Sequence, residues 1–162
     1  MKLNMLLFFP IFAFILSCAK VVDSDIFDLN KNLTYSVIPF ENYSDTPLAG
    51  YRIASIVESV LRVKGYKVIN KVWKYKDTDP TEEELEENFN KASLKSDMVI
   101  YGTVNEFRYK TGIDGEPAVS ITIYIYDVKK GYVIKSATVS ATGSSGESLG
   151  TVTQRLIREL FE

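Results

Sequence analysis

Alternating apolar and polar residues predict two long strands in the second half of the chain, over 98–108 and 118–128. The second strand is the clearer one: its two faces carry Val119, Ile121, Ile123 and Ile125 on one side and Ser120, Thr122, Tyr124 and Tyr126 on the other. Successive side chains of a strand point to opposite faces, so the first set is predicted to be core. The second set is hydroxylic and aromatic rather than charged, which indicates a partly covered face.

The remaining elements follow from turn residues and helical spacing. A first strand is expected over 33–40 and a short second one over 66–72, with a helix between them from about Leu48 to Gly65. A second helix should begin at Thr81, where Thr81 and Glu84 fit a capping box. Lys129-Lys130-Gly131 predicts a tight turn into a strand over 132–142, and a final amphipathic helix carries Leu149, Val152, Leu156, Ile157 and Leu160. The order β-α-β-α-β-β-β-α predicts an α/β (α+β) fold, a mixed sheet with helices packed on it.

The first residues are typical of an export signal rather than of the fold. Lys2 precedes an apolar run from Leu3 to Leu16, and Ile15-Leu16-Ser17-Cys18 matches the bacterial lipobox. We expect residues 1–17 to be a lipoprotein signal peptide and Cys18, the single cysteine, to carry lipid, with acylation of the new amino terminus as well. An ordinary secretory signal with an accidental cysteine is the alternative.

The segment 18–31 is polar and acidic, and is expected to be a lipidated tether, with Ile26 and Phe27 as docking points on the domain. Residues 32–162 are then a single periplasmic domain of ordinary globular composition. Ala19 follows the cysteine, so the usual enteric sorting rule favours the outer membrane over the inner one. Several acyl chains would give a stable anchor where one would not.

Composition argues against several classes of function. The chain has 19 basic and 21 acidic residues, and a weakly acidic domain without a basic cluster is a poor nucleic-acid binder. It has no histidine, so Gly146-Glu147-Ser148-Leu149-Gly150 lacks the usual base of a nucleophile elbow, and turn and cap chemistry explains it. The glutamates of 82–87 fan around a helix and favour a solvated helix start over a metal cluster. We therefore expect no enzyme, no metal and no cofactor.

The loop between the two long strands is unusually rich in polar residues. Asp114 and Glu116 lie between Gly112 and Pro117, so a hairpin turn explains them, with Arg108 and Lys110 as ion-pair partners. From the residues alone this structural interpretation is favoured. Trp73 lies among lysines and is either buried or in contact with a membrane interface, where indole is favoured, burial being slightly preferred.

Two blocks of sequence carry a resemblance to known lipoproteins. The segment 37–50, ahead of a helix with Leu61 and Gly65, resembles the start of the outer-membrane lipoprotein superfamily that contains CsgG of curli secretion and LpoB, an activator of penicillin-binding proteins. The segment 106–119 resembles the PelC family, the export lipoproteins of the Pel exopolysaccharide system. Three further matches support it: Tyr126-Asp127-Val128, Ser136-Ala137-Thr138 and Gln154-Arg155-Leu156-Ile157. The resemblance covers roughly Leu33 to the C-terminus.

The resemblance implies a non-enzymatic lipoprotein on the periplasmic side of the outer membrane. Such proteins form a dodecameric ring around a β-barrel porin of the PelB type and present acidic surface to a cationic exopolysaccharide. Carried over by position, Asp114 and Glu116 would face the polymer, and Arg108 and Tyr109 would be structural or interface residues. The alternatives are an LpoB-like activator of a penicillin-binding protein and a lipopolysaccharide-assembly lipoprotein.

Overall fold

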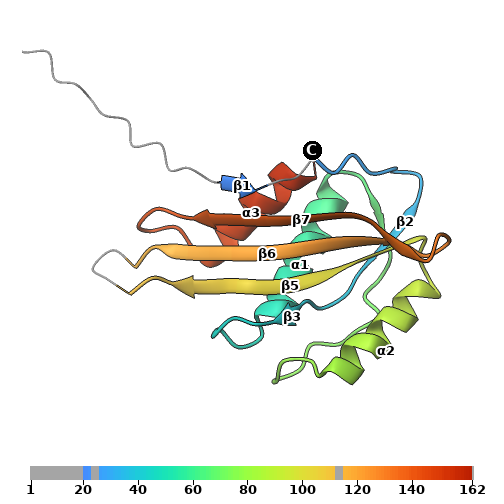
Figure 1. Cartoon of the computed structure of the whole chain (residues 1–162), viewed down its shortest axis with the longest axis horizontal. Helices are drawn as coiled ribbons and strands as arrows, with labels where there is room; N and C mark the ends of the chain where they lie inside the picture. The colour runs from blue at the N-terminus through green and yellow to red at the C-terminus, as the bar shows by residue number, and fades with distance from the viewer. Residues whose placement is uncertain (1–19, 23–25, 112–114, 162) are drawn as a thin grey trace, which may run out of the picture.

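The computed structural model describes residues 20–22, 26–111 and 115–161, which form one mixed sheet and three helices (Figure 1). The strands are β1 (Lys20–Val22), β2 (Thr34–Val37), β3 (Glu41–Asn42), β4 (Lys67–Val68), β5 (Met98–Tyr109), β6 (Pro117–Asp127) and β7 (Tyr132–Thr142). The helices are α1 (Ala49–Val63), α2 (Glu82–Ser93) and α3 (Leu149–Leu160). This is the predicted order of elements with two short strands added, β1 and β3. The α+β fold class is confirmed.

The sheet has the strand order β1-β7-β6-β5-β2-β4, with β3 pairing β5. Its centre is the antiparallel meander β5-β6-β7, joined by the hairpin loop and by the predicted turn at 129–131. Strand β2 runs parallel to both β4 and β5. Parallel neighbours need a crossover connection, and α1 and α2 supply the two crossovers.

The two faces of the meander differ as the alternation predicts. Helices α1 and α3 both lie behind the sheet in Figure 1, and the β6 residues Val119, Ile121, Ile123 and Ile125 are buried on the core side. The residues between them are only partly covered. Helix α2 reaches this outer face at one end through Phe89, whose ring meets Tyr101 and Tyr126 edge-on with centroid distances of 5.5 and 5.0 Å. None of the three described helices covers the rest of the outer face.

Hydroxyl groups bridge the strands on that outer face. The Thr122 and Thr138 hydroxyls are 2.9 Å apart, and the Ser140 hydroxyl donates to Ser120 at 2.8 Å. Asn105 connects strand β5 to these bonds, since its side-chain amide donates to the Thr122 hydroxyl at 3.0 Å. These bonds satisfy the side chains of a polar face without any charge.

Part of the predicted tether belongs to the fold. Strand β1 pairs antiparallel with β7, and the Phe27 amide donates to the Leu160 carbonyl at 2.7 Å. The Phe27 side chain is buried and meets the Phe161 ring edge-on. Docking therefore uses Phe27, as predicted, whereas Ile26 is half exposed and that part of the prediction is wrong. A free tether over the whole of 18–31 is not what the structure shows.

Two predicted strands are shorter than expected. The first, predicted over 33–40, is found only as β2 and ends at Val37, and the second, predicted over 66–72, is found only as β4. The link Ile38-Pro39-Phe40 follows β2 and leads to β3, which lies beyond the predicted range. The link is needed because Phe40 enters the core beside the first turn of α1. Its amide donates to the Gly50 carbonyl at 3.3 Å, and the Phe40 side chain is fully buried.

Two glycines make room for Phe40. A Cβ on Gly50 would lie 1.9 Å from the Phe40 carbonyl oxygen, and a Cβ on Gly102 would lie 2.8 Å from the Phe40 ring and 1.9 Å from the Thr122 carbonyl oxygen. Backbone atoms cannot move aside as a flexible side chain can. Both positions therefore require glycine for close approach of the chain.

We expect Gly50→Ala to destabilise the domain by about 3 kcal/mol, because the new methyl group forces α1 away from the Phe40 backbone. Urea unfolding followed by circular dichroism measures this. Gly150→Ala is the matched control, since the added Cβ in α3 meets only the Ser148 hydroxyl at 3.7 Å. The control should be as stable as the wild type or slightly more so. Equal stability of Gly50→Ala and the wild type would contradict the close packing.

Candidate functional site

Of the two carboxylates that the resemblance assigns to the polymer, the structure describes Glu116, at the end of the β5–β6 hairpin. Cys18 and Asp114 lie outside the described residues, and Glu116 directly precedes β6. The Lys110 amide donates to the Glu116 carbonyl at 2.7 Å, and Lys110 Nζ lies 4.0 Å from the Glu116 carboxylate. Both side chains are about half exposed, so this pair contributes about 0–1 kcal/mol. The Glu116 charge is accessible to solvent but has a cation beside it.

Arg108 makes its ion pair along its own strand. Its Nε donates to the Glu106 carboxylate at 2.9 Å, so the guanidinium pairs two residues back, whereas Glu116 has Lys110 beside it. Within the described chain Arg108 thus does not join two strands. A contact with a neighbouring subunit stays a prediction.

Tyr109 connects the hairpin end to the start of α3. Its hydroxyl accepts a long hydrogen bond, 3.4 Å, from the Leu149 amide, while half of the side chain is exposed. The bond satisfies one of the free amides of the first helical turn. This geometry fits the structural part of the role predicted for Tyr109.

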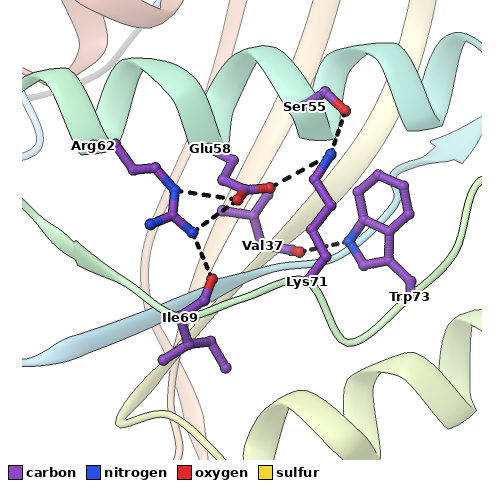
Figure 2. A network of polar contacts seen from close by, with 7 residues as sticks. All are labelled: Val37, Ser55, Glu58, Arg62, Ile69, Lys71 and Trp73. Carbon is purple, nitrogen blue, oxygen red and sulfur yellow. Dashed lines mark hydrogen bonds and ion pairs between the residues drawn. The ribbon is translucent and has the colours of Figure 1, made fainter.

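Trp73 is buried rather than presented to a membrane. Its indole N–H donates to the Val37 carbonyl at 2.9 Å, which fastens the loop after β4 to strand β2 (Figure 2). The Lys71 ammonium lies 4.5 Å from the centre of the indole ring. Of the two placements predicted for Trp73 the structure has the buried one, and a membrane contact through this indole is incompatible with it.

The same loop is held to α1 by a buried carboxylate (Figure 2). Glu58 accepts from Arg62 at 2.9 and 3.2 Å, and its second oxygen lies 3.7 Å from the Lys71 ammonium. Arg62 also donates to the Ile69 carbonyl, and Lys71 donates to the Ser55 hydroxyl. The two cations compensate a carboxylate that would be costly to bury alone. This network holds the loop after β4 against α1.

A groove of about 560 Å³ opens between the start of α2 and the outer face of the sheet. Tyr101, Gly102 and Thr103 of β5 and Tyr124 of β6 form its floor. Leu85 and Phe89 of α2 face Ile38 and Pro39 of the β2–β3 link across it. The volume lies within the range of small-ligand sites.

Three carboxylates, from Glu41, Glu82 and Glu86, line this groove, and its described lining contains no lysine or arginine. None of the three forms an ion pair with another described residue. Other glutamates of α2 are paired: Glu84 with Lys76, and Glu87 with Lys91 at 2.6 Å. Among the described residues Glu83 is unpaired as well but does not line the groove, so Glu82 and Glu86 are the glutamates of α2 whose charges face it without a cation.

A capping box sets which glutamates face the groove. The Thr81 hydroxyl accepts from the Glu84 amide at 3.3 Å, and the Glu84 carboxylate accepts from the Thr81 amide at 3.1 Å. The predicted box is confirmed, and Lys76 together with this cap lowers the pKa of Glu84. With the helix start fixed, Glu82 and Glu86 are one turn apart on the same side.

Aromatic rings accompany the groove carboxylates. The Tyr101 and Tyr124 rings are 5.3 Å apart at 35°, and burial, followed by the charges of Tyr124 and Tyr126, raises the pKa of Tyr101. Tyr43 stands at the rim, 64% exposed. A hydrogen bond to the Glu41 carboxylate is the main cause that raises the pKa of Tyr43, and burial and the charges of Glu41 and Glu82 add to it. An exposed ring beside carboxylates can stack on a ligand ring or attract a cation.

Other candidate chemistry has structural explanations. The Ser148 hydroxyl accepts from the Thr151 amide at 3.1 Å as the N-cap of α3, so the elbow pattern marks a helix start. Over the described ranges no group of residues has the arrangement of a metal site. None of the three described helices is both long and apolar enough to cross a membrane.

The sequence alone did not reveal the groove. The glutamate run 82–87 is a normal helix start, and only the packing of Phe89 on the sheet shows which of its carboxylates face the same space as Glu41. The available signal was the outer face of β6, where Tyr124 and Tyr126 indicated a partly covered, aromatic surface.

Comparison with solved structures finds two PelC dodecamers from Paraburkholderia phytofirmans among the similar proteins. A single-substitution variant is 33% identical with a TM-score of 0.71, covering 88% of this chain and 95% of that one. A second crystal form is 31% identical with a TM-score of 0.66, covering 87% and 95%. Lipoprotein GNA1162 from Neisseria meningitidis shares the fold, at 20% identity and a TM-score of 0.51 over 76% of this chain and 94% of that one. No family model and no curated protein matches the chain.

Trp73 is the single tryptophan of the chain, so its fluorescence reports the burial directly. We expect a blue-shifted emission in the lipid-anchored protein that brominated lipids do not quench. Trp73→Phe should cost about 1–3 kcal/mol, because the Val37 carbonyl is left without its donor. Tyr132→Phe, which removes an exposed hydroxyl, is the control and should leave the stability unchanged. Quenching by brominated lipids would contradict the buried placement.

Proposed function

Since the chain belongs to the PelC family, we propose that it is a non-enzymatic lipoprotein of an exopolysaccharide export complex. The observation that carries the proposal is the match to PelC dodecamers at 31–33% identity over 95% of their length. It favours export over the two alternatives, activation of a penicillin-binding protein and lipopolysaccharide assembly. The protein would act at the periplasmic face of the outer membrane, held there by lipid on Cys18.

In this proposal the protein works as a homo-oligomer. The similar structures are dodecamers, which supports a ring of many copies. Around a β-barrel porin of the PelB type, such a ring would form the entrance for a cationic polymer. Asp114 and Glu116 would contribute acidic surface to that entrance, and Arg108 would lie at or near a contact between subunits.

The physical basis is repetition of a small charge. One chain carries a formal net charge of −2, which alone attracts a polycation weakly. A ring multiplies that charge, and a concave surface of one sign concentrates counter-ions. Contacts made through exposed carboxylates are screened by salt and break quickly, so the polymer can keep moving.

No chemical step is needed for this role. The chain has no histidine, and its one candidate serine nucleophile, Ser148, serves as a helix cap. The covalent modification required would be lipid at Cys18, on its thiol and on the new amino terminus. Strand β1 begins at Lys20, so an anchor on Cys18 would hold the β7 edge of the sheet next to the membrane.

We expect Cys18→Ser to release the protein from the membrane, because the thioether to lipid cannot form. Cell fractionation measures its position, and polymer export in cells that lack the wild-type copy measures function. Export should fall to the level of the deletion strain although the domain still folds. A Ser17→Ala variant keeps a small residue at the cleavage site and should behave as the wild type. Membrane attachment of Cys18→Ser would contradict the lipid anchor.

The double variant Asp114→Asn, Glu116→Gln should lower polymer export about tenfold, since every copy in the ring loses two charges from the entrance. The control is Asp77→Asn, Glu83→Gln, which removes the same charges from exposed positions elsewhere. Its export should match that of the wild type. Unchanged export in the first variant would remove these two residues from the polymer-facing surface.

A further inference from the structure

The groove beside α2 combines features that the proposed ring does not use. Its three carboxylates have no cation among the described lining residues, and two tyrosines make its floor. All three carboxylates are exposed and form no ion pair with another described residue. Their charge is therefore free to attract a cation that enters the groove.

The tyrosine rings of the groove indicate what kind of cation it suits. Tyr101 and Tyr124 are tilted by 35° to each other, and Tyr43 stands exposed at the rim with its hydroxyl on Glu41. Aromatic faces of this kind accept flat apolar surfaces and ammonium groups. A pyranose ring that carries a protonated amine offers an apolar ring face and an ammonium group, whereas a neutral sugar offers only the ring face.

We propose that this groove binds the protonated amino-sugar units of a cationic polysaccharide, with Glu41, Glu82 and Glu86 facing the amines and the tyrosines facing the sugar rings. The choice of a sugar chain over a basic peptide rests on the proposed export function. The inference adds one binding site per protomer, separate from the acids at the β5–β6 hairpin end. Each site is shallow and solvated, which suits rapid exchange.

The direct test measures binding of a glucosamine tetrasaccharide to the full-length lipoprotein by calorimetry, at mildly acidic pH where the amines are protonated. The wild type should bind it, and the N-acetylglucosamine tetrasaccharide, which lacks the charges, should bind at least about tenfold more weakly. Equal binding of the two probes would overturn the role of the carboxylates.

Variants of α2 isolate the groove. Glu82→Gln, Glu86→Gln should weaken the glucosamine probe about tenfold and reduce its sensitivity to salt, because two charge pairs are lost. Glu83→Gln, Glu87→Gln removes the same charge from other positions of the same helix and should bind within about twofold of the wild type. Both pairs are exposed, so circular dichroism should show intact folds. Equal affinities of the two double variants would overturn the assignment.

Tyr43 tests the aromatic part. Tyr43→Ala should weaken the probe several-fold, while Tyr43→Phe keeps the ring and should retain the affinity. Equal binding of Tyr43→Ala and the wild type would remove this ring from the site. Tetralysine binding as tightly as the sugar, with the same dependence on Glu82 and Glu86, would replace the sugar by a basic peptide.

The assembled protein distinguishes the remaining outcomes. If the oligomer protects α2 from hydrogen exchange and excludes the probe, the groove is an interface between copies and the inference fails. Export in cells is measured separately. If the wild-type gene restores export but none of the variants changes probe binding, the groove assignment is wrong and the proposed function still holds. Loss of the proposed function would show instead as no effect of the wild-type gene on export.

Discussion

The burial of Phe40 between two glycines is the contact on which the other parts of the structure depend. The chain passes so close to Gly50 that α1 begins against the Phe40 backbone, and the Phe40 ring fills the space over Gly102. Neighbouring residues of the same link, Ile38, Pro39 and Glu41, line the groove instead. One short segment therefore positions a core helix on one face and a wall of the candidate site on the other.

Helices α1 and α3 both lie on the core side of the sheet, so they leave the outer face uncovered (Figure 1). Of the three described helices α2 alone reaches the outer face, and Phe89 covers part of Tyr101 and Tyr126 there. Farther along the strands, hydroxyls such as Thr122 and Thr138 satisfy one another. A self-satisfied polar face gives little reason for a ligand to bind, whereas the aromatic end beside α2 has carboxylates without cations. The two parts of one face thus differ in what they can attract.

The sequence predicted most of the fold because its signals are local. Alternation over β6, the capping box at Thr81 and the amphipathic stripe of α3 each depend on residues close in the chain, and each is found in the structure. Strands β1 and β3 were missed because they are held by backbone bonds to β7 and β5, which no side-chain pattern records. Trp73 lies among lysines, so its local sequence fits either placement, and a hydrogen bond to Val37, 36 residues away, decides for the buried one.

The candidate site shows the same limit more sharply. Asp114 and Glu116 were singled out by resemblance, and the described one, Glu116, has Lys110 beside it. Glu82 and Glu86 looked like part of a solvated helix start, yet their side of α2 is the one without cations. What separates them from Glu84 and Glu87 is the direction in which each side chain leaves the helix, and tertiary packing alone decides that direction. Glu84 caps the helix and pairs with Lys76, and Glu87 pairs with Lys91, so both have a structural role. Glu82 and Glu86 have no such partner among the described residues and line a groove, so a binding role is best sought there.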